Sequence, residues 1–199
     1  LSVDEMRAVD ENCEWLGISR LMLMENAGAA VARAISEEIG DVEGKKVVVV
    51  AYLGNKGGDG FVAARHLARE GAAVEVFLLG SPSEIRTDEA RRNWQALQNL
   101  EYSVKVAVLR DSSQISELSN SLQKADVVVD ALLGTGAVGP PREPIASAVK
   151  AINSVRDKAL VVSIDLPTGL DADSGKVYEP AVRAHITVTH HKPKKGFLS

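Results

Sequence analysis

Three segments that carry glycines or carboxylates each follow a run of residues typical of a β-strand. The first segment is Gly-Asn-Lys-Gly-Gly-Asp-Gly at 54–60. Asp130 ends the second run and leads into a glycine-containing loop at 131–136. Asp165 ends the third run, and a loop with proline and glycine follows at 166–171. Because ligands of open α/β sheets bind outside the carboxyl ends of the strands, we expect the three segments to meet at one site.

The segment at 54–60 has the composition of an anion-binding turn. Glycine lets backbone N–H groups approach an anion closely, and the helix expected to follow points its positive dipole end at the same place. We therefore predict binding of a phosphate-bearing nucleotide, although the pattern is neither Gly-x-Gly-x-x-Gly nor a P-loop. The alternative is a tight turn that merely needs glycine. Four glycines in seven residues exceed that need and favour the phosphate site.

Asp130 and Asp165 are the candidate chemical groups of the other two loops. A carboxylate at a strand end can ligate a cation, accept a ligand hydroxyl or transfer a proton. Pro167 restricts Leu166 to extended conformations, which would hold Asp165 in the fixed pose that catalysis requires. Each aspartate could instead cap a turn with its side chain. The occurrence of three such loops in one chain favours a functional site.

Strands and helices alternate along the chain and must position these loops. The apolar runs predict strands at 46–51, 73–79, 102–109, 125–130, 159–165 and 184–190. Amphipathic stretches predict helices at 3–16, 19–39, 58–70, 87–100, 113–123 and 144–154. Short connections between them predict an α/β, Rossmann-like three-layer sandwich, with a mostly parallel sheet and helices on both faces. The two N-terminal helices must pack outside the sheet or against a partner.

Composition narrows the class of protein. The 199 residues suit one domain over 1–199, and the net charge of −4 gives no electrostatic footprint for nucleic acid. The single cysteine, Cys13, excludes an internal disulfide and suits a reducing cytoplasm. No apolar run approaches the roughly 20 residues that span a bilayer, and no signal peptide is visible. We thus expect a cytoplasmic protein without nucleic-acid or membrane partners, and we expect the basic tail at 192–195 to be solvated.

Four segments in order, at 23–28 (Leu-Met-Glu-Asn-Ala-Gly), 54–60, 130–136 and 164–171, resemble the YjeF N-terminal domain, the NAD(P)HX epimerase family. The resemblance covers nearly the whole chain. It implies an isomerase that interconverts the R and S epimers of NADHX or NADPHX, the hydrated forms of the reduced nicotinamide cofactors, at the hydroxylated carbon of the ring. It also implies a fused or separate dehydratase that restores the S form, and a homodimer, for which the apolar face at 21–24 is available.

The resemblance implies roles for individual residues. The substrate-contacting loop corresponds to Asn55, Lys56, Gly57, Gly58 and Asp59. A second contact loop corresponds to Gly134, Thr135, Gly136, Ala137, Val138, Gly139 and Pro140. The substrate-binding acid corresponds to Asp165, which we expect to act as both catalytic acid and base. The family also binds a potassium ion, and the positions of its ligands correspond to Lys56, Asp130 and Thr168.

Lys56 departs from the family pattern, which commonly has a second asparagine there. An ammonium has no lone pair and cannot ligate a cation through its side chain. Two alternatives follow: K⁺ binds with Lys56 turned away, through a backbone oxygen, or the ammonium stands in for the ion beside Asp130. Thr168 replaces the usual serine and keeps the hydroxyl, and Tyr52 stands where glycine is more usual.

Two other functions compete with the epimerase. Gly-Gly-Asp-Gly at 57–60 also occurs in NAD and lipid kinases, but Thr or Ser typically follows there and Phe61 follows here. Relatives of the domain also serve as non-catalytic nucleotide- or protein-binding modules. The presence of both Asp130 and Asp165 favours the enzyme over the module.

Overall fold

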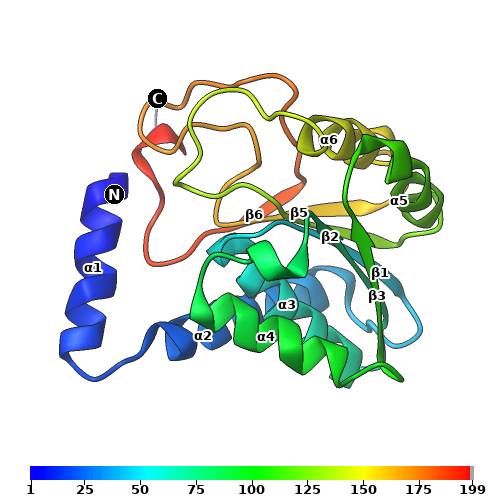
Figure 1. Ribbon diagram of the computed structural model, residues 1–199, viewed down its shortest axis with the longest axis horizontal. Helices are drawn as coiled ribbons and strands as arrows, with labels where there is room; N and C mark the ends of the chain where they lie inside the picture. The colour runs from blue at the N-terminus through cyan, green and yellow to red at the C-terminus, as the bar shows by residue number, and fades with distance from the viewer. Residues whose placement is uncertain (198–199) are drawn as a thin grey trace.

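The computed structural model describes residues 1–197 and contains one parallel six-stranded sheet in the order β3-β2-β1-β4-β5-β6 (Figure 1). The strands are β1 (Lys46–Ala51), β2 (Ala73–Leu79), β3 (Val104–Leu109), β4 (Val127–Ala131), β5 (Leu160–Ile164) and β6 (Ile186–Val188). The chain forms the central strand β1 first and adds β2 and β3 on one side of it. It then adds β4, β5 and β6 on the other side of β1. The order therefore reverses between β1 and β4, where the carboxyl ends leave a crevice for ligands. The predicted fold class is confirmed.

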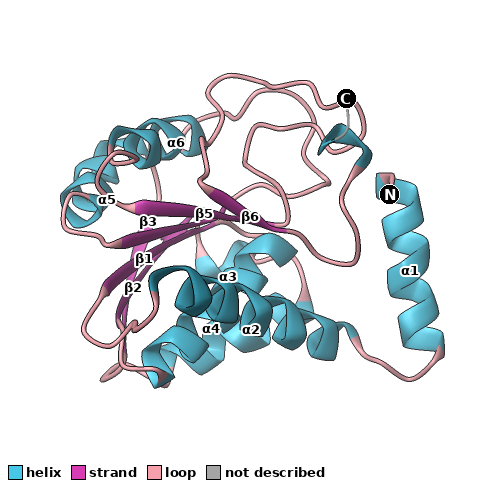
Figure 2. Cartoon of the chain, turned by 180° about the vertical axis from the view of Figure 1, so that it is seen from behind, coloured by secondary structure: helices cyan, strands magenta, loops and turns pink. Residues whose placement is uncertain are grey.

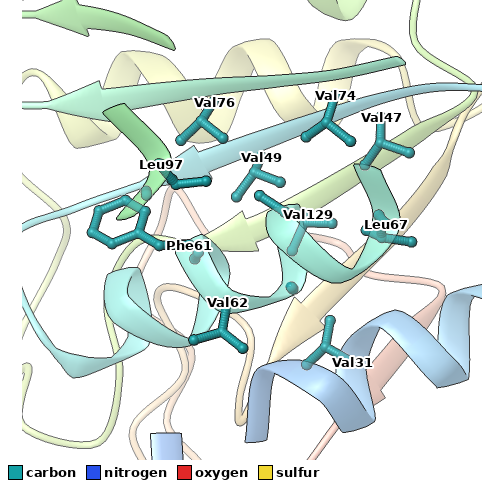
Figure 3. Close-up of a cluster of buried hydrophobic side chains, with 14 of the residues drawn as sticks. Val31, Val47, Val49, Phe61, Val62, Leu67, Val74, Val76, Leu97 and Val129 are labelled. Carbon is teal, nitrogen blue, oxygen red and sulfur yellow. The ribbon is translucent and has the colours of Figure 1, made fainter. Parts of the chain in front are cut away.

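Helices cover both faces of the sheet, as Figure 2 shows. One layer holds α2 (Arg20–Ile39), α3 (Asn55–Arg69) and α4 (Asp88–Gln98), and the other holds α5 (Ile115–Leu122) and α6 (Ile145–Ser154). The central strands are buried on both faces, which explains their unbroken β-branched sequence. Figure 3 shows valines of β1, β2 and β4 packed against Phe61, Val62 and Leu67 of α3.

The N-terminal helix α1 (Val3–Trp15) begins with the predicted capping box between Ser2 and Glu5. Met6 is its one buried residue. The backbone N–H of Val3 donates to Asp173 Oδ1 (3.0 Å), and the carbonyl of Leu1 accepts from Lys195 N–H (3.0 Å). Contacts with the loop after β5 and with the C-terminal segment thus hold the start of this helix, whereas α2 packs on α3.

The glycine-rich segment at 54–60 is helical, which corrects the expected loop followed by a helix from 58. Gly54 is the N-cap of α3, and the helix begins at Asn55. A β-carbon at Gly57 would overlap the carbonyl oxygen of Tyr52, and one at Gly60 would lie 2.6 Å from Ala131 Cβ. These glycines let α3 lie unusually close to β1 and β4. Close packing is therefore a sufficient reason for them, with or without a bound phosphate.

Other differences concern the ends of elements. The strand expected at 102–109 starts at Val104 and lies at the sheet edge, where an exposed Lys105 is tolerated. The helix expected at 113–123 is split into a 3₁₀ turn, Ser112–Gln114, and α5. Further 3₁₀ turns occur at Pro82–Glu84 and Lys195–Phe197. No helix within residues 1–197 is both long enough and apolar enough to cross a membrane.

Candidate active site

A cavity of about 680 Å³ lies beside the residues that follow β1, β4, β5 and β6. This volume falls in the usual range for small-molecule sites. Parts of α1 and α2 form the opposite wall. Eight of the predicted site residues line the cavity: Asn55, Lys56, Asp59, Gly134, Thr135, Gly136, Ala137 and Asp165. The structure thus brings the three strand-end segments together.

The remaining predicted residues lie elsewhere. Gly57 and Gly58 are buried inside α3. Val138, which is 87% exposed, lies with Gly139 and Pro140 outside the cavity wall. Asp130 and Thr168 are fully buried behind the cavity. The site residues therefore form two groups, one facing the cavity and one beneath it.

Asp165 faces the cavity from an unusual backbone conformation. Its φ is 64°, in the left-handed region, and Leu166 N–H donates to the Ile164 carbonyl (2.7 Å) across it. The Asp165 N–H donates to the Val188 carbonyl of β6 (2.8 Å). Few non-glycine residues adopt this region, aspartate and asparagine more readily than most, and those that do cluster at functional sites. The tight turn sets the direction in which the carboxylate leaves the backbone.

Lys194 pairs with Asp165 and corrects the expectation of a solvated basic tail. Its side chain is 1% exposed, and its Nζ donates to Asp165 Oδ1 and to the His190 carbonyl (3.0 Å). His190 N–H donates to the same carboxylate oxygen (3.2 Å). No signal in the sequence separates Lys194 from the exposed Lys192, because the approach to Asp165 depends on how the chain turns after β6. The pair places a buried positive charge against the candidate acid.

Asp59 is a second carboxyl group on the cavity wall. Burial raises the pKa of Asp59 above its ordinary value, and the nearby His190 opposes this increase. His190 Nε2 lies 3.6 Å from Asp59 Oδ2. This buried nitrogen has no hydrogen-bond partner among residues 1–197. The cavity therefore presents two carboxyl groups in different surroundings, one beside an ammonium and one buried near an imidazole.

Lys56 reaches beneath the cavity and lies at the centre of four oxygen atoms. Its Nζ is 3.0 Å from Asp130 Oδ2, 3.2 Å from Thr168 Oγ1, 3.1 Å from the Leu133 carbonyl and 2.8 Å from the Leu166 carbonyl. Burial lowers the pKa of the Lys56 ammonium, and the Asp130 carboxylate counteracts this. The carbonyl oxygens can only accept hydrogen bonds, so this arrangement needs the charged ammonium. In this structure Lys56 is not turned away from the aspartate.

The Asp130 carboxylate is saturated with hydrogen bonds. Oδ2 accepts from Lys56, from Ser163 Oγ (2.8 Å) and from Thr168 N–H (2.9 Å). Oδ1 accepts from Thr168 Oγ1 (2.7 Å) and from Leu132 N–H (3.2 Å). Asp130 therefore joins the loops after β4 and β5 instead of facing a ligand. Within residues 1–197 no group of three or more His, Cys, Asp or Glu side chains could hold a metal ion.

Arg20 and Arg86 also line the cavity, and the sequence reasoning did not single them out. Arg86 lies over the Tyr52 ring, 5.5 Å from its centroid. Guanidinium groups suit phosphate oxygens because they donate in a planar fork. Arg86 lies in the loop after β2. The sequence could have indicated it, because position after a strand is what pointed to the other three segments. Arg20 at the start of α2 carries no such signal.

The comparisons with known proteins agree with this geometry. The family model described as YjeF-related protein N-terminus matches residues 20–196. The chain belongs to this family. It is 44% identical over 99% of its length to the bifunctional NAD(P)H-hydrate repair enzyme Nnr of Hyperthermus butylicus, of which it covers 35%. It is 43% identical over 98% of its length to the NAD(P)H-hydrate epimerase of Cenarchaeum symbiosum, of which it covers 86%.

A solved structure gives the same fold. The crystal structure of yeast ynu0 matches the whole chain with a TM-score of 0.84 and 30% identity, and 82% of the yeast chain is covered. The chain spans about a third of the length of the bifunctional relatives. The predicted family is thus confirmed.

Proposed function

We propose that this chain is an NAD(P)H-hydrate epimerase, which interconverts the R and S forms of NADHX and NADPHX. The proposal rests on one observation above others. Asp59 and Asp165 lie on the wall of a single cavity, in a chain that aligns over 98% of its length with a relative named as this enzyme. The names of the bifunctional relatives support a dehydratase partner, fused or separate, that acts on the S form.

The cavity provides groups suited to the phosphates of a dinucleotide. Asn55 and Lys56 belong to the first turn of α3, where backbone N–H groups have no partner within the helix and the dipole favours anions. Arg20 and Arg86 add two guanidinium groups to the wall. These groups would hold the phosphates and leave the nicotinamide ring near the carboxyl groups.

The proposed reaction removes and returns a hydroxyl group. The carbon that carries the hydroxyl lies next to a ring nitrogen, whose lone pair can stabilise the cation formed when the C–O bond breaks. The hydroxyl takes a proton and leaves as water. Water then adds to the opposite face and gives up a proton, which inverts the centre. The reaction therefore needs one proton donor, one proton acceptor and a negative charge near the cation.

Asp165 and Asp59 can share these tasks. Lys194 and His190 N–H both contact Asp165 Oδ1 and hold the carboxyl group at the cavity wall. The Asp165 carboxylate would stabilise the cation and accept the proton of the incoming water. Burial raises the pKa of Asp59, so this group would keep a proton to give to the leaving hydroxyl. This division refines the expectation that Asp165 alone serves as acid and base.

A coupled assay tests the function. A mixture of R and S NADPHX is treated with excess S-specific dehydratase, which consumes the S form and leaves R to convert slowly. The protein is then added, and NADPH absorbance is followed. We expect faster recovery of the R pool, and a loss of about 10²–10⁴-fold in this rate for Asp165→Asn, because a positioned proton-transfer group contributes this much. Normal rates in folded Asp165→Asn would contradict the assignment of Asp165, and no acceleration by the wild type would contradict the function.

A further inference from the structure

The oxygen atoms around Lys56 Nζ form a cage suited to a monovalent cation. Two main-chain carbonyls, one carboxylate and one hydroxyl converge on a single point, and all four lie 2.8–3.2 Å from Nζ. An ammonium has three protons, so the four acceptors exceed the hydrogen bonds that it can donate singly. The excess of acceptors around one point is typical of ion coordination, in which direction matters less than number.

We infer that the Lys56 ammonium permanently replaces the potassium ion that the family resemblance implies, so that this protein binds no potassium at this site. The Asp130 carboxylate is fully buried and needs a positive charge beside it. Lys56 supplies that charge from within the chain. A potassium ion would need the point held by Nζ, so the side chains present do not fit the ion.

The path of the Lys56 side chain supports this replacement. The residue is 5% exposed, and its stem passes against Gly134, where an added β-carbon would lie 3.5 Å from Lys56 Cβ. The first turn of α3 directs the side chain toward the loops after β4 and β5. An asparagine at this position is shorter and uncharged, so it brings no positive charge to the cage. A chain with asparagine there would leave the cage open to an ion from solution.

The replacement has a consequence for the neighbouring acid. Leu166 and Thr168 contact Nζ through the same loop that carries Asp165. A lysine binds this loop at any salt concentration, whereas a potassium site fills only when the ion is abundant. The loop should therefore keep its conformation without potassium.

Cation binding by the unmodified protein gives the first test. The protein is dialysed into tetramethylammonium chloride, and binding of radioactive rubidium, a potassium analogue, is measured by equilibrium dialysis. Thermal unfolding is compared in potassium, sodium and tetramethylammonium chloride at equal ionic strength. We expect no saturable rubidium binding and no potassium-specific shift of the midpoint. Saturable binding of one rubidium per chain would overturn the inference.

Lys56→Asn gives the converse test, with the exposed Lys150 of α6, changed to asparagine, as the matched control. Lys56→Asn should unfold at a lower temperature in tetramethylammonium chloride, bind rubidium, and regain stability selectively in potassium. Lys150→Asn should show none of these changes. A folded Lys56→Asn protein without a cation response would overturn the view that the cage is a cation site. If this variant does not fold, the unmodified protein decides the matter. Neither readout needs substrate, so failure here is separate from failure of the proposed epimerase.

Discussion

Two lysine–aspartate pairs lie near the carboxyl ends of the central strands, and they differ in what surrounds the carboxylate. In the Lys56–Asp130 pair both oxygens of the aspartate are saturated by donors, and its side chain is 0% exposed. In the Lys194–Asp165 pair the aspartate is 12% exposed at the cavity wall. Among residues 1–197 its side-chain hydrogen bonds go to Oδ1.

The difference separates a structural role, that of Asp130, from the proposed catalytic role of Asp165. A saturated carboxylate has no capacity left for a ligand, so Asp130 holds the loops together. Asp165 keeps an oxygen for substrate or water, and its lysine holds the carboxylate in position. The same two residue types therefore serve different purposes according to how many donors surround the acid. Substitutions in the two pairs should affect different properties.

Asp130→Asn should have the largest effect on stability. Removing one partner of a buried pair leaves the other charge uncompensated, which costs about 3–5 kcal/mol of unfolding free energy. Urea unfolding followed by circular dichroism measures the change. Asp165→Asn is the comparison and should lose less: it also leaves the buried Lys194 without a carboxylate, but Asp165 is 12% exposed, accepts donors on one oxygen, and is replaced by a residue that tolerates the left-handed conformation. Equal losses in the two variants would contradict the separation.

Asp59 should set the alkaline limit of activity. The proposed acid must be protonated, and its raised pKa means that the rate falls as pH increases through that higher value. His190, Asp165 and Lys56 are the charged or titratable groups that influence it. Asp59→Asn should lose about 10²-fold in rate and should also lose this alkaline limb. The pH profile of kcat/KM measures both effects, and an unchanged limb in the variant would assign it to another group.

Lys194→Gln should reduce kcat by about tenfold, which corresponds to a loss of roughly 1.4 kcal/mol of transition-state stabilisation. Without the ammonium, Asp165 Oδ1 loses its charged partner, and the carboxylate is held less firmly at the cavity wall. Lys194→Arg should restore part of the loss because it keeps the charge. A change in stability alone, with kcat unchanged, would reduce Lys194 to a packing role.

Lys46→Ala should have the smallest effect. Lys46 Nζ lies 3.1 Å from Glu75 Oε2, and the two side chains are 28% and 23% exposed. Partly exposed pairs of this kind contribute about 0–1 kcal/mol. Urea unfolding should therefore detect little change. A loss of unfolding free energy as large as that of Asp130→Asn would show that the N–O distance, and not the burial of the pair, determines how much these ion pairs contribute to stability.

The fold was largely predictable because its signals are local. Runs of valine such as 47–50 indicate strands buried on both faces, and their alternation with amphipathic stretches indicates parallel crossovers. The helical state of 55–60 was not predictable by the same reasoning. The glycines there make room for Tyr52, which follows β1, and for Ala131 of β4. Local propensity disfavours glycine in a helix, and tertiary packing overrides it.

The site was predictable in part. Asp59, Asp165 and the loop at 134–137 follow strands, so topology alone brings them to one edge. Lys194 was missed because it lies 29 residues after Asp165 in the sequence, across an irregular segment of the chain. The sequence left two alternatives for Lys56, and the position of its Nζ among the four oxygens is what supports the inferred replacement of the ion.

The left-handed φ of Asp165 limits which residues can evolve at this position. The backbone accepts glycine, asparagine and aspartate with little penalty, and it disfavours the longer or branched side chains. The proposed chemistry accepts only a carboxylate. Aspartate is the one residue that satisfies both requirements, and glutamate fails the first although it satisfies the second. A saturation library at this position, sorted once for folding and once for activity, should therefore retain a small set after the first selection and a single residue after the second.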